Sequence, residues 1–220
     1  MYLLTELNEF IADIGVNYAI CGGHAIDLFL DRKTRTHKDL DVAVFWEDRN
    51  KVVQYMIDNG WEVYEPCGME HLHKINNIQK QKLTKSNIWC IKPGNPHYTF
   101  IEYEKDMFAV EFDDSEQIEL NYIEFLFNTR KDKDFLYARN HDIKMKLGIA
   151  IMAADGIPYI APELVLLYKS TAADEMEYQL DFDNTFPKLN KEQVVWLKNA
   201  LHTMFPTGHK WIDSINICIP

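Results

Sequence analysis

The chain has 220 residues, 47% of them hydrophobic, which is enough for a substantial core in one full domain or two small ones. Its formal net charge is −11, so its surface would repel a phosphate backbone and we expect no nucleic-acid partner. No apolar run approaches the roughly 18 residues of a membrane span, and the acidic, amphipathic start does not resemble a signal peptide. We therefore expect a cytoplasmic protein without a membrane segment.

The cysteines are too widely spaced to suggest a structural role. They are Cys21, Cys67, Cys90 and Cys218, and none belongs to a CxxC pair. This spacing favours neither a zinc site nor a disulfide framework, which fits a reducing compartment.

Hydrophobic periodicity predicts mixed helices and strands in the first part of the chain. Helices are expected over 2–14, 24–30 and 47–59. Strands are expected over 18–21, 39–44 and 61–64, and further along over 87–92, 98–103 and 117–127.

From Asp155 the pattern becomes helical. A turn at Asp155-Gly156 precedes a helix that begins near Ala161, and Asn190 with Gln193 predicts a capping box for a helix over 191–204. The sequence thus predicts an α+β fold: a small mixed β-sheet domain with flanking helices over 1–155, then a helical C-terminal region over 156–220.

The pair Asp39 and Asp41 lies on a predicted strand, where residues two apart project from the same face. Two adjacent carboxylates repel each other unless a cation lies between them, and Mg²⁺ prefers a few carboxylates together with phosphate oxygens and waters. The pattern therefore favours a magnesium site that supports phosphoryl or nucleotidyl transfer. A solvated strand face is the alternative.

Gly22 and Gly23 lie between a predicted strand and a predicted helix. Without side chains they allow phosphates to approach backbone N–H groups, and the following helix directs its positive end at the same place. A plain turn is the alternative. A phosphate cradle and an acidic pair joined by one loop are together the minimum equipment for nucleotidyl transfer.

The stretch from Cys21 to Val44 resembles the motif of the polymerase-beta-like nucleotidyltransferases. That motif is Gly-Gly or Gly-Ser, a helix, and then Asp-x-Asp on the next strand. The version here places fifteen residues between Gly23 and Asp39 and includes Thr34-Arg35-x-His37-x-Asp39. It is similar to the lincosamide and 2''-aminoglycoside nucleotidyltransferases.

The resemblance implies a third carboxylate on a neighbouring strand, as the base toward the acceptor hydroxyl. Two acids of the strand predicted over 117–127, Glu124 and Glu119, are candidates, and Glu124 is favoured because a charged turn follows its apolar surroundings. The two are five residues apart and would face opposite sides of a regular strand. The remaining alternative is that both are surface acids.

Two cations are predicted to bind the nucleotide. Arg35 precedes the acidic strand and is suited to phosphate, the alternative being a structural ion pair with Asp27 or Asp31. Lys169 is predicted to reach the triphosphate, with an exposed helix lysine as the alternative.

After Lys169 the sequence departs from the pattern of related proteins, which argues against a nucleotide contact from that segment. Related proteins commonly carry a Lys-Asp pair a few residues before an Asp-Phe; here Asp181-Phe182 is present, but Glu177-Tyr178 stands where the Lys-Asp pair is expected.

These observations lead to one hypothesis and two alternatives. The hypothesis is Mg-dependent transfer of NMP from a nucleoside triphosphate, with ATP the expected donor, to a hydroxyl of a small molecule such as an aminoglycoside- or lincosamide-like acceptor. Asp39, Asp41 and Glu124 would be catalytic, the first two also as metal ligands, and Gly22, Gly23, Arg35 and Lys169 would bind the nucleotide. The alternatives are a noncatalytic nucleotide-binding regulator and a protein nucleotidyltransferase of toxin–antitoxin type. Acceptor identity, base preference and oligomeric state do not follow from the sequence.

Overall fold

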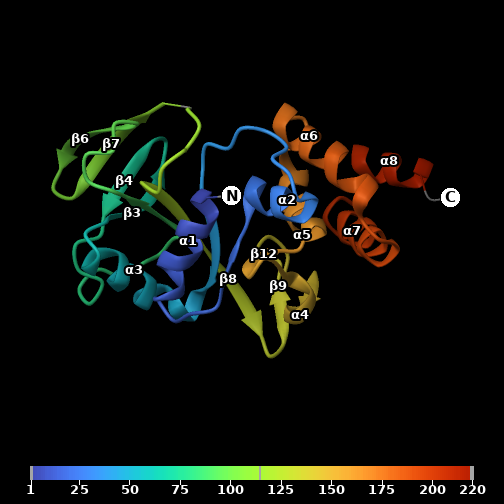
Figure 1. The fold of residues 1–220 in the computed structure, drawn as a ribbon, viewed down its shortest axis with the longest axis horizontal. Helices are drawn as coiled ribbons and strands as arrows, with labels where there is room; N and C mark the ends of the chain where they lie inside the picture. Colours follow the sequence, from blue (N-terminus) through green and yellow to red (C-terminus); the bar gives the residue numbers. More distant parts are fainter. Residues whose placement is uncertain (1, 114, 219–220) are drawn as a thin grey trace. The chain divides into compact units, whose positions relative to one another are not determined.

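The computed structural model describes residues 2–113 and 115–218 (Figure 1). The chain forms two compact units, each built from two segments. Unit 1 comprises Met1–Ile20 and Thr36–Asn128, and unit 2 comprises Cys21–Arg35 and Thr129–Pro220. These are not the continuous segments 1–155 and 156–220 suggested by the sequence, because the helix that follows the first strand is part of unit 2.

Unit 1 is organised around a mixed sheet with the strand order β1-β2-β8-β5-β3-β4-β7-β6. The strands are β1 (Tyr18–Ile20), β2 (Asp41–Phe45), β3 (Glu62–Gly68), β4 (His71–Lys74), β5 (Asn87–Ile91), β6 (Tyr98–Glu104), β7 (Met107–Phe112) and β8 (Tyr122–Lys131). Strands β2 and β8 run parallel, whereas the other neighbouring pairs in this series are antiparallel.

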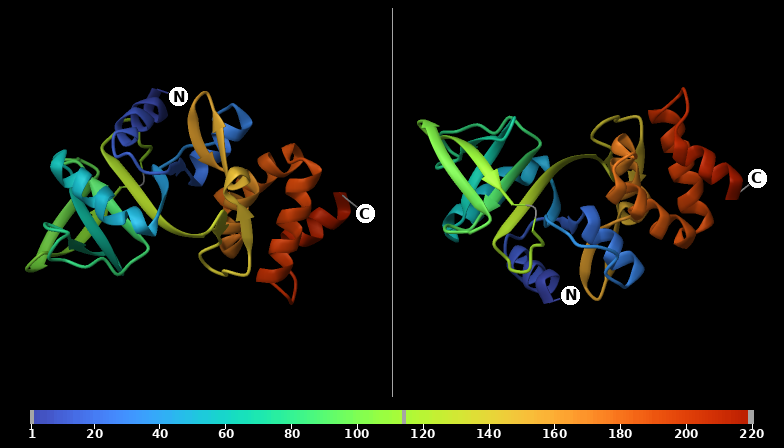
Figure 2. Two further views of the ribbon diagram at one scale, coloured as in Figure 1. Left: turned by 90° about the horizontal axis from the view of Figure 1, so that it is seen from below. Right: turned by 90° about the horizontal axis from the view of Figure 1, so that it is seen from above.

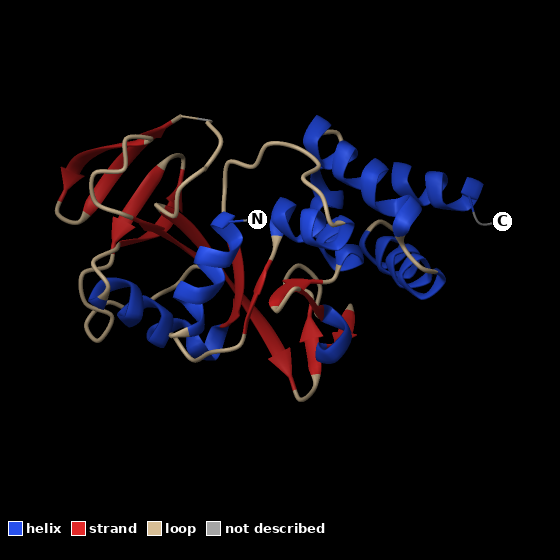
Figure 3. Cartoon of the chain, in the orientation of Figure 1, coloured by secondary structure: helices blue, strands red, loops and turns tan. Residues whose placement is uncertain are grey.

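Two amphipathic helices complete unit 1. Helix α1 (Tyr2–Ala12) and helix α3 (Arg49–Asp58, preceded by the short helix η1, Trp46–Asp48) each bury an apolar stripe. The Tyr55 hydroxyl donates to the carbonyl oxygen of Phe10 at 2.9 Å and so joins the helices, which lie side by side in Figure 3.

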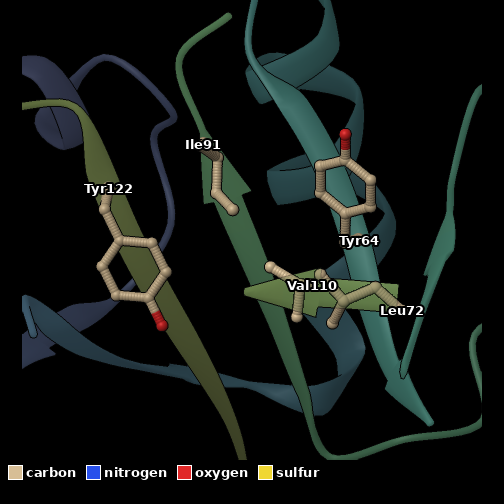
Figure 4. Packing of buried hydrophobic residues seen from close by; sticks show 5 residues of the cluster. All are labelled: Tyr64, Leu72, Ile91, Val110 and Tyr122. Atoms are coloured by element: carbon tan, nitrogen blue, oxygen red, sulfur yellow. The ribbon is translucent and has the colours of Figure 1, made fainter. Parts of the chain in front are cut away.

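An aromatic core occupies one face of the unit 1 sheet. Its fully enclosed members are Tyr64, Leu72, Ile91, Val110 and Tyr122 (Figure 4). Partly buried rings pack against them: Trp89, Tyr98, Phe100 and Phe108. This core adjoins the acids discussed below, because Tyr64 pairs with Trp89 and Trp89 pairs with Glu124 in adjacent strands, and such partners face the same side of a sheet.

Unit 2 is mainly helical. Its helices are α2 (Gly22–Leu30), α4 (Leu147–Ala150), α5 (Pro162–Lys169), α6 (Met176–Thr185), α7 (Lys191–Met204) and α8 (Lys210–Cys218), with the short helices η2 (Ser170–Ala172) and η3 (Phe186–Lys188). Helix α5 packs against α2, α6 and α7, as the views in Figure 2 show. The Phe182 ring stacks on Trp211 with centroids 4.5 Å apart, which fixes α6 against α8.

Short strands complete unit 2. They are β9 (Asp134–Leu136), β10 (Lys144–Lys146), β11 (Ile151–Ala154) and β12 (Ile157–Ile160), and β9 also pairs with the end of β8. The Asp155-Gly156 turn joins β11 to β12, with φ of 49° and 81°, as a tight hairpin requires.

The predicted α+β class, with a mixed sheet, flanking helices and C-terminal helices, is confirmed. The capping box is also confirmed, since Asn190 and Gln193 each accept the other's backbone N–H at 3.0 Å. The strand predicted over 117–127 was wrong at its start, because β8 begins at Tyr122. The Gln117 side chain donates to the Tyr122 carbonyl at 2.7 Å, a local bond that competes with strand pairing. Across the described ranges, no helix has the length and apolar character needed to cross a bilayer.

Glu163 gives a test of the helical packing in unit 2. Its side chain is 2% exposed in α5, and burial raises its pKa, although the Gln193 side chain donates to Oε2 at 2.8 Å. A raised pKa means that the folded state resists ionisation more than the unfolded chain, so the fold loses stability as pH rises above roughly 4.3. We expect Glu163→Gln to raise the free energy of unfolding at pH 7 and to leave it nearly unchanged below about pH 4.

Urea unfolding from pH 3.5 to 8 measures this difference. Glu192→Gln is the matched control, because Glu192 is an exposed acid in the first turn of α7. Equal destabilisation by Glu163→Gln at every pH would contradict the expectation.

Candidate active site

Two acids meet where the parallel strands β2 and β8 pair. Asp41 begins β2 and lies opposite Glu124 of β8, and the Glu124 amide donates to the Leu40 carbonyl at 2.9 Å. Both side chains are partly exposed, whereas Leu40 and Val42 beside Asp41 are fully buried. Alternation along β2 turns Asp41 away from its buried neighbours, and the pairing of β2 with β8 places Glu124 beside it at the sheet surface.

Asp39 precedes β2 and is exposed, so it lies outside the strand on which it was predicted. Its charge nevertheless acts on Glu124 and on two neighbouring tyrosines. Burial raises the pKa of Glu124, and the negative charge of Asp39 raises it further. Burial also raises the pKa values of Tyr98 and Tyr122, and the charges of Asp39 and Glu124 raise both of them further. The carboxylates and the two neutral phenols thus form one electrostatic group within unit 1.

Two neighbours hold the Glu124 carboxylate. The Asn87 side-chain amide donates to Oε1 at 2.6 Å, and the Tyr122 hydroxyl donates to Oε2 at 3.4 Å. The bond from Asn87 lowers the pKa of Glu124 and partly opposes the effect of burial. Sequence reasoning missed Asn87; its signal is a polar residue at the start of an otherwise apolar strand, Asn87-Ile-Trp-Cys-Ile91.

Glu119, the alternative third acid, is exposed in the irregular segment before β8. Its carbonyl oxygen accepts from the Asn121 amide at 2.9 Å, so its backbone forms a turn and not a ladder. Of the two candidates, Glu124 is the one in register with Asp41.

The diglycine belongs to unit 2. It was predicted to precede a helix over 24–30, but Gly22 and Gly23 are themselves the first residues of α2. Gly22 has a φ of 62°, a left-handed conformation that favours glycine, and the Cys21 side chain does not cap the helix. The first-turn N–H groups have no intrahelical acceptor, which makes this end of the helix suitable for an anion.

Hydrogen bonds to side chains and to the backbone hold the loop after α2. Asp27 Oδ1 accepts from the Thr34 amide at 2.8 Å and from the Thr34 hydroxyl at 2.6 Å, which supports a structural role for Asp27. His37 is 4% exposed, and its carbonyl oxygen accepts from the Gln117 amide at 3.2 Å.

Arg35 and Lys169 share a buried partner that sequence reasoning did not assign. Arg35 Nε and Nη2 donate to the two carboxylate oxygens of Asp181, each at 3.1 Å, and Lys169 Nζ lies 2.8 Å from Asp181 Oδ2. Arg35 also pairs with Glu177, its Nη1 lying 3.1 Å from Oε2, and the charge of Asp27 acts on it as well. Lys169 is 7% exposed, which is unlike an exposed helix lysine.

The predicted site residues therefore form two groups. Asp39, Asp41 and Glu124 belong to unit 1, and Gly22, Gly23, Arg35 and Lys169 belong to unit 2. The first group offers only hard oxygen donors, the ligands that Mg²⁺ prefers, and the second combines backbone N–H groups with two cations, which suits phosphate.

Part of the chain matches a known protein family. Residues 3–76 match the family model of the aminoglycoside-2''-adenylyltransferases. The chain is similar to that family. This confirms the resemblance stated from the sequence. No curated protein matches the chain in sequence.

Solved structures show the same fold. The solution structure of the antibiotic-resistance factor ANT(2'')-Ia superposes with a TM-score of 0.50 at 16% identity, covering 93% of this chain and 92% of that one. The lincomycin-bound crystal structure of the lincosamide antibiotic adenylyltransferase LnuA superposes with a TM-score of 0.52 at 14% identity, covering 83% of this chain and 94% of that one.

Replacing Asn87 tests how the carboxylate of Glu124 is held. Asn87→Leu removes the donor to Oε1, so we expect the pKa of Glu124 to rise further. Tyr122→Phe removes a longer contact and should produce a smaller rise. A carboxyl ¹³C NMR titration measures both, and an unchanged pKa in Asn87→Leu would show that this bond does not act on Glu124.

Proposed function

We propose that the protein is a Mg-dependent nucleotidyltransferase that moves NMP from a nucleoside triphosphate, with ATP as the donor, to a hydroxyl of a small molecule. One observation carries the proposal: Asp41 and Glu124 lie opposite each other on parallel strands, and the charge of Asp39 acts on Glu124. Such crowding of carboxylates at a partly exposed sheet surface is favourable when a divalent cation neutralises it.

The carboxylates divide the chemical work. Asp39 and Asp41 are the residues that would hold Mg²⁺, which when bound supplies neutralisation of phosphate charge. Glu124 accepts the proton of the acceptor hydroxyl as the new oxygen–phosphorus bond forms and the bond to pyrophosphate breaks. Its raised pKa makes it a stronger base than an exposed glutamate, and Asn87 fixes its orientation.

Unit 2 provides the phosphate-binding groups. The first turn of α2, at Gly22 and Gly23, presents backbone N–H groups to a phosphate, and Arg35 and Lys169 add positive charge. Nucleotidyl transfer depends on positioning and on charge neutralisation more than on covalent chemistry.

The comparisons and the overall charge support a small acceptor. The family model is that of an aminoglycoside adenylyltransferase, and one fold neighbour is a lincosamide adenylyltransferase with lincomycin bound. The net charge of −11 favours a cationic or neutral acceptor over a nucleic acid. An aminoglycoside- or lincosamide-like molecule meets both conditions.

Pyrophosphate release from ATP with Mg²⁺ and a panel of aminoglycosides and lincosamides tests the proposal. Asp39→Asn, Asp41→Asn and Glu124→Gln should each lower kcat by about 10²- to 10⁴-fold, as expected for the loss of a group that assists proton transfer or charge neutralisation. Chelation of the divalent metal should abolish turnover.

Glu119→Gln is the control for the third acid, because the proposal assigns Glu119 no role. If Glu119→Gln lost activity and Glu124→Gln retained it, the assignment of the base would be overturned. ATP binding without turnover on any acceptor would favour a noncatalytic regulator, and transfer of label to protein alone would favour a protein nucleotidyltransferase.

A further inference from the structure

Asp181 is a buried charge that the proposed mechanism does not use. It lies on α6 with an exposed fraction of 0%. Both its oxygens accept from the Arg35 guanidinium, and Oδ2 also lies 2.8 Å from the Lys169 ammonium. A buried carboxylate with two cationic partners is fully engaged, so it fixes the positions of both cations.

A second acid contacts the same guanidinium from a different environment. Glu177 lies one helical turn before Asp181 on α6, and its Oε2 is 3.1 Å from Arg35 Nη1. Its side chain is 51% exposed, compared with 0% for Asp181. Ion pairs exposed to this extent are weak and exchange readily with solvent and with other anions.

The Glu177 carboxylate makes the contact that a phosphate oxygen would make. Carboxylate and phosphate oxygens bind the guanidinium fork with the same geometry. Arg35 and Lys169 are the positive groups of this cluster and Asp181 and Glu177 contact them directly, while the charge of Asp27 also acts on Arg35. Removal of the Glu177 contact takes one negative charge away from Arg35, which favours an incoming phosphate, while Asp181 still orients both cations.

We infer that the two acids act on Arg35 in opposite senses: Asp181 is a positioning residue for the nucleotide phosphates, and Glu177 is an exchangeable competitor that a phosphate must displace. This rests on the proposed nucleotide-binding function and adds a regulatory contact to it. Lys169 also contacts the Tyr178 ring, whose centroid lies 4.2 Å from Nζ.

Isothermal titration of the full chain with ATP and Mg²⁺ tests the inference. Glu177→Gln should tighten ATP binding about two- to fivefold, the factor that corresponds to a half-exposed ion pair. Asp181→Asn should weaken ATP binding at least tenfold, because Arg35 and Lys169 lose their common anchor. A residue that merely stabilised the fold would not produce effects of opposite sign.

Asp183→Asn is the matched control, because it removes one negative charge from an exposed position of the same helix. Its ATP affinity should equal that of the wild type. The inference is overturned if Glu177→Gln binds ATP no better than wild type, or no better than Asp183→Asn. Because Glu177 is half-exposed, this comparison decides the matter even if Asp181→Asn does not fold.

Binding and turnover separate this inference from the proposed function. Tighter ATP binding by Glu177→Gln without transfer to any acceptor would leave the inference standing and overturn the enzymatic proposal. Transfer by the wild type, together with an unchanged ATP affinity in Glu177→Gln, would support the enzymatic proposal and overturn this inference. Absence of ATP binding by the wild type would overturn both.

Discussion

The parallel pairing of β2 with β8 is the constraint on which the acidic site depends. It brings Asp41 opposite Glu124 although the two residues lie far apart in the sequence. The register is fixed by burial, because Val42 and its partner Phe125 are each 0% exposed and face the core. A slip of one residue would turn Glu124 into that core and carry Phe125 to the surface, which the fold does not tolerate.

The same pairing explains the unusual electrostatics of the site. Glu124 continues the row that contains Trp89 and Tyr64, so its carboxyl lies beside an aromatic core as well as beside other acids. Apolar surroundings and like charge act in the same direction on its pKa, and the amide of Asn87 opposes them. A nearby cation would stabilise the ionised form of such a carboxyl group. Cation binding would therefore also stabilise unit 1 against unfolding.

Local patterns in the sequence identified most of the strands and candidate acids, but not the residues that contact them. Period-2 alternation located β2, and the family resemblance directed attention to Glu124. The start of β8 was misplaced because Gln117 and Ile118 are compatible with a strand, while the side-chain bond of Gln117 to the Tyr122 carbonyl is not visible in sequence. Asn87 and its bond to Glu124 depend on the antiparallel pairing of β5 with β8, which no local pattern specifies.

The Arg35 cluster shows where sequence reasoning ends and tertiary structure begins. Glu177 and Asp181 are four residues apart on α6 and so lie on one face of the helix. The packing of α6 against α2 and α5 buries one and leaves the other half-exposed. Burial converts the first into a fixed anchor, since an isolated charge in the interior is very unfavourable, and solvent keeps the second exchangeable. The two carboxylates on the same arginine therefore differ in solvation, and Asp181 also binds Lys169, so we assign them different roles.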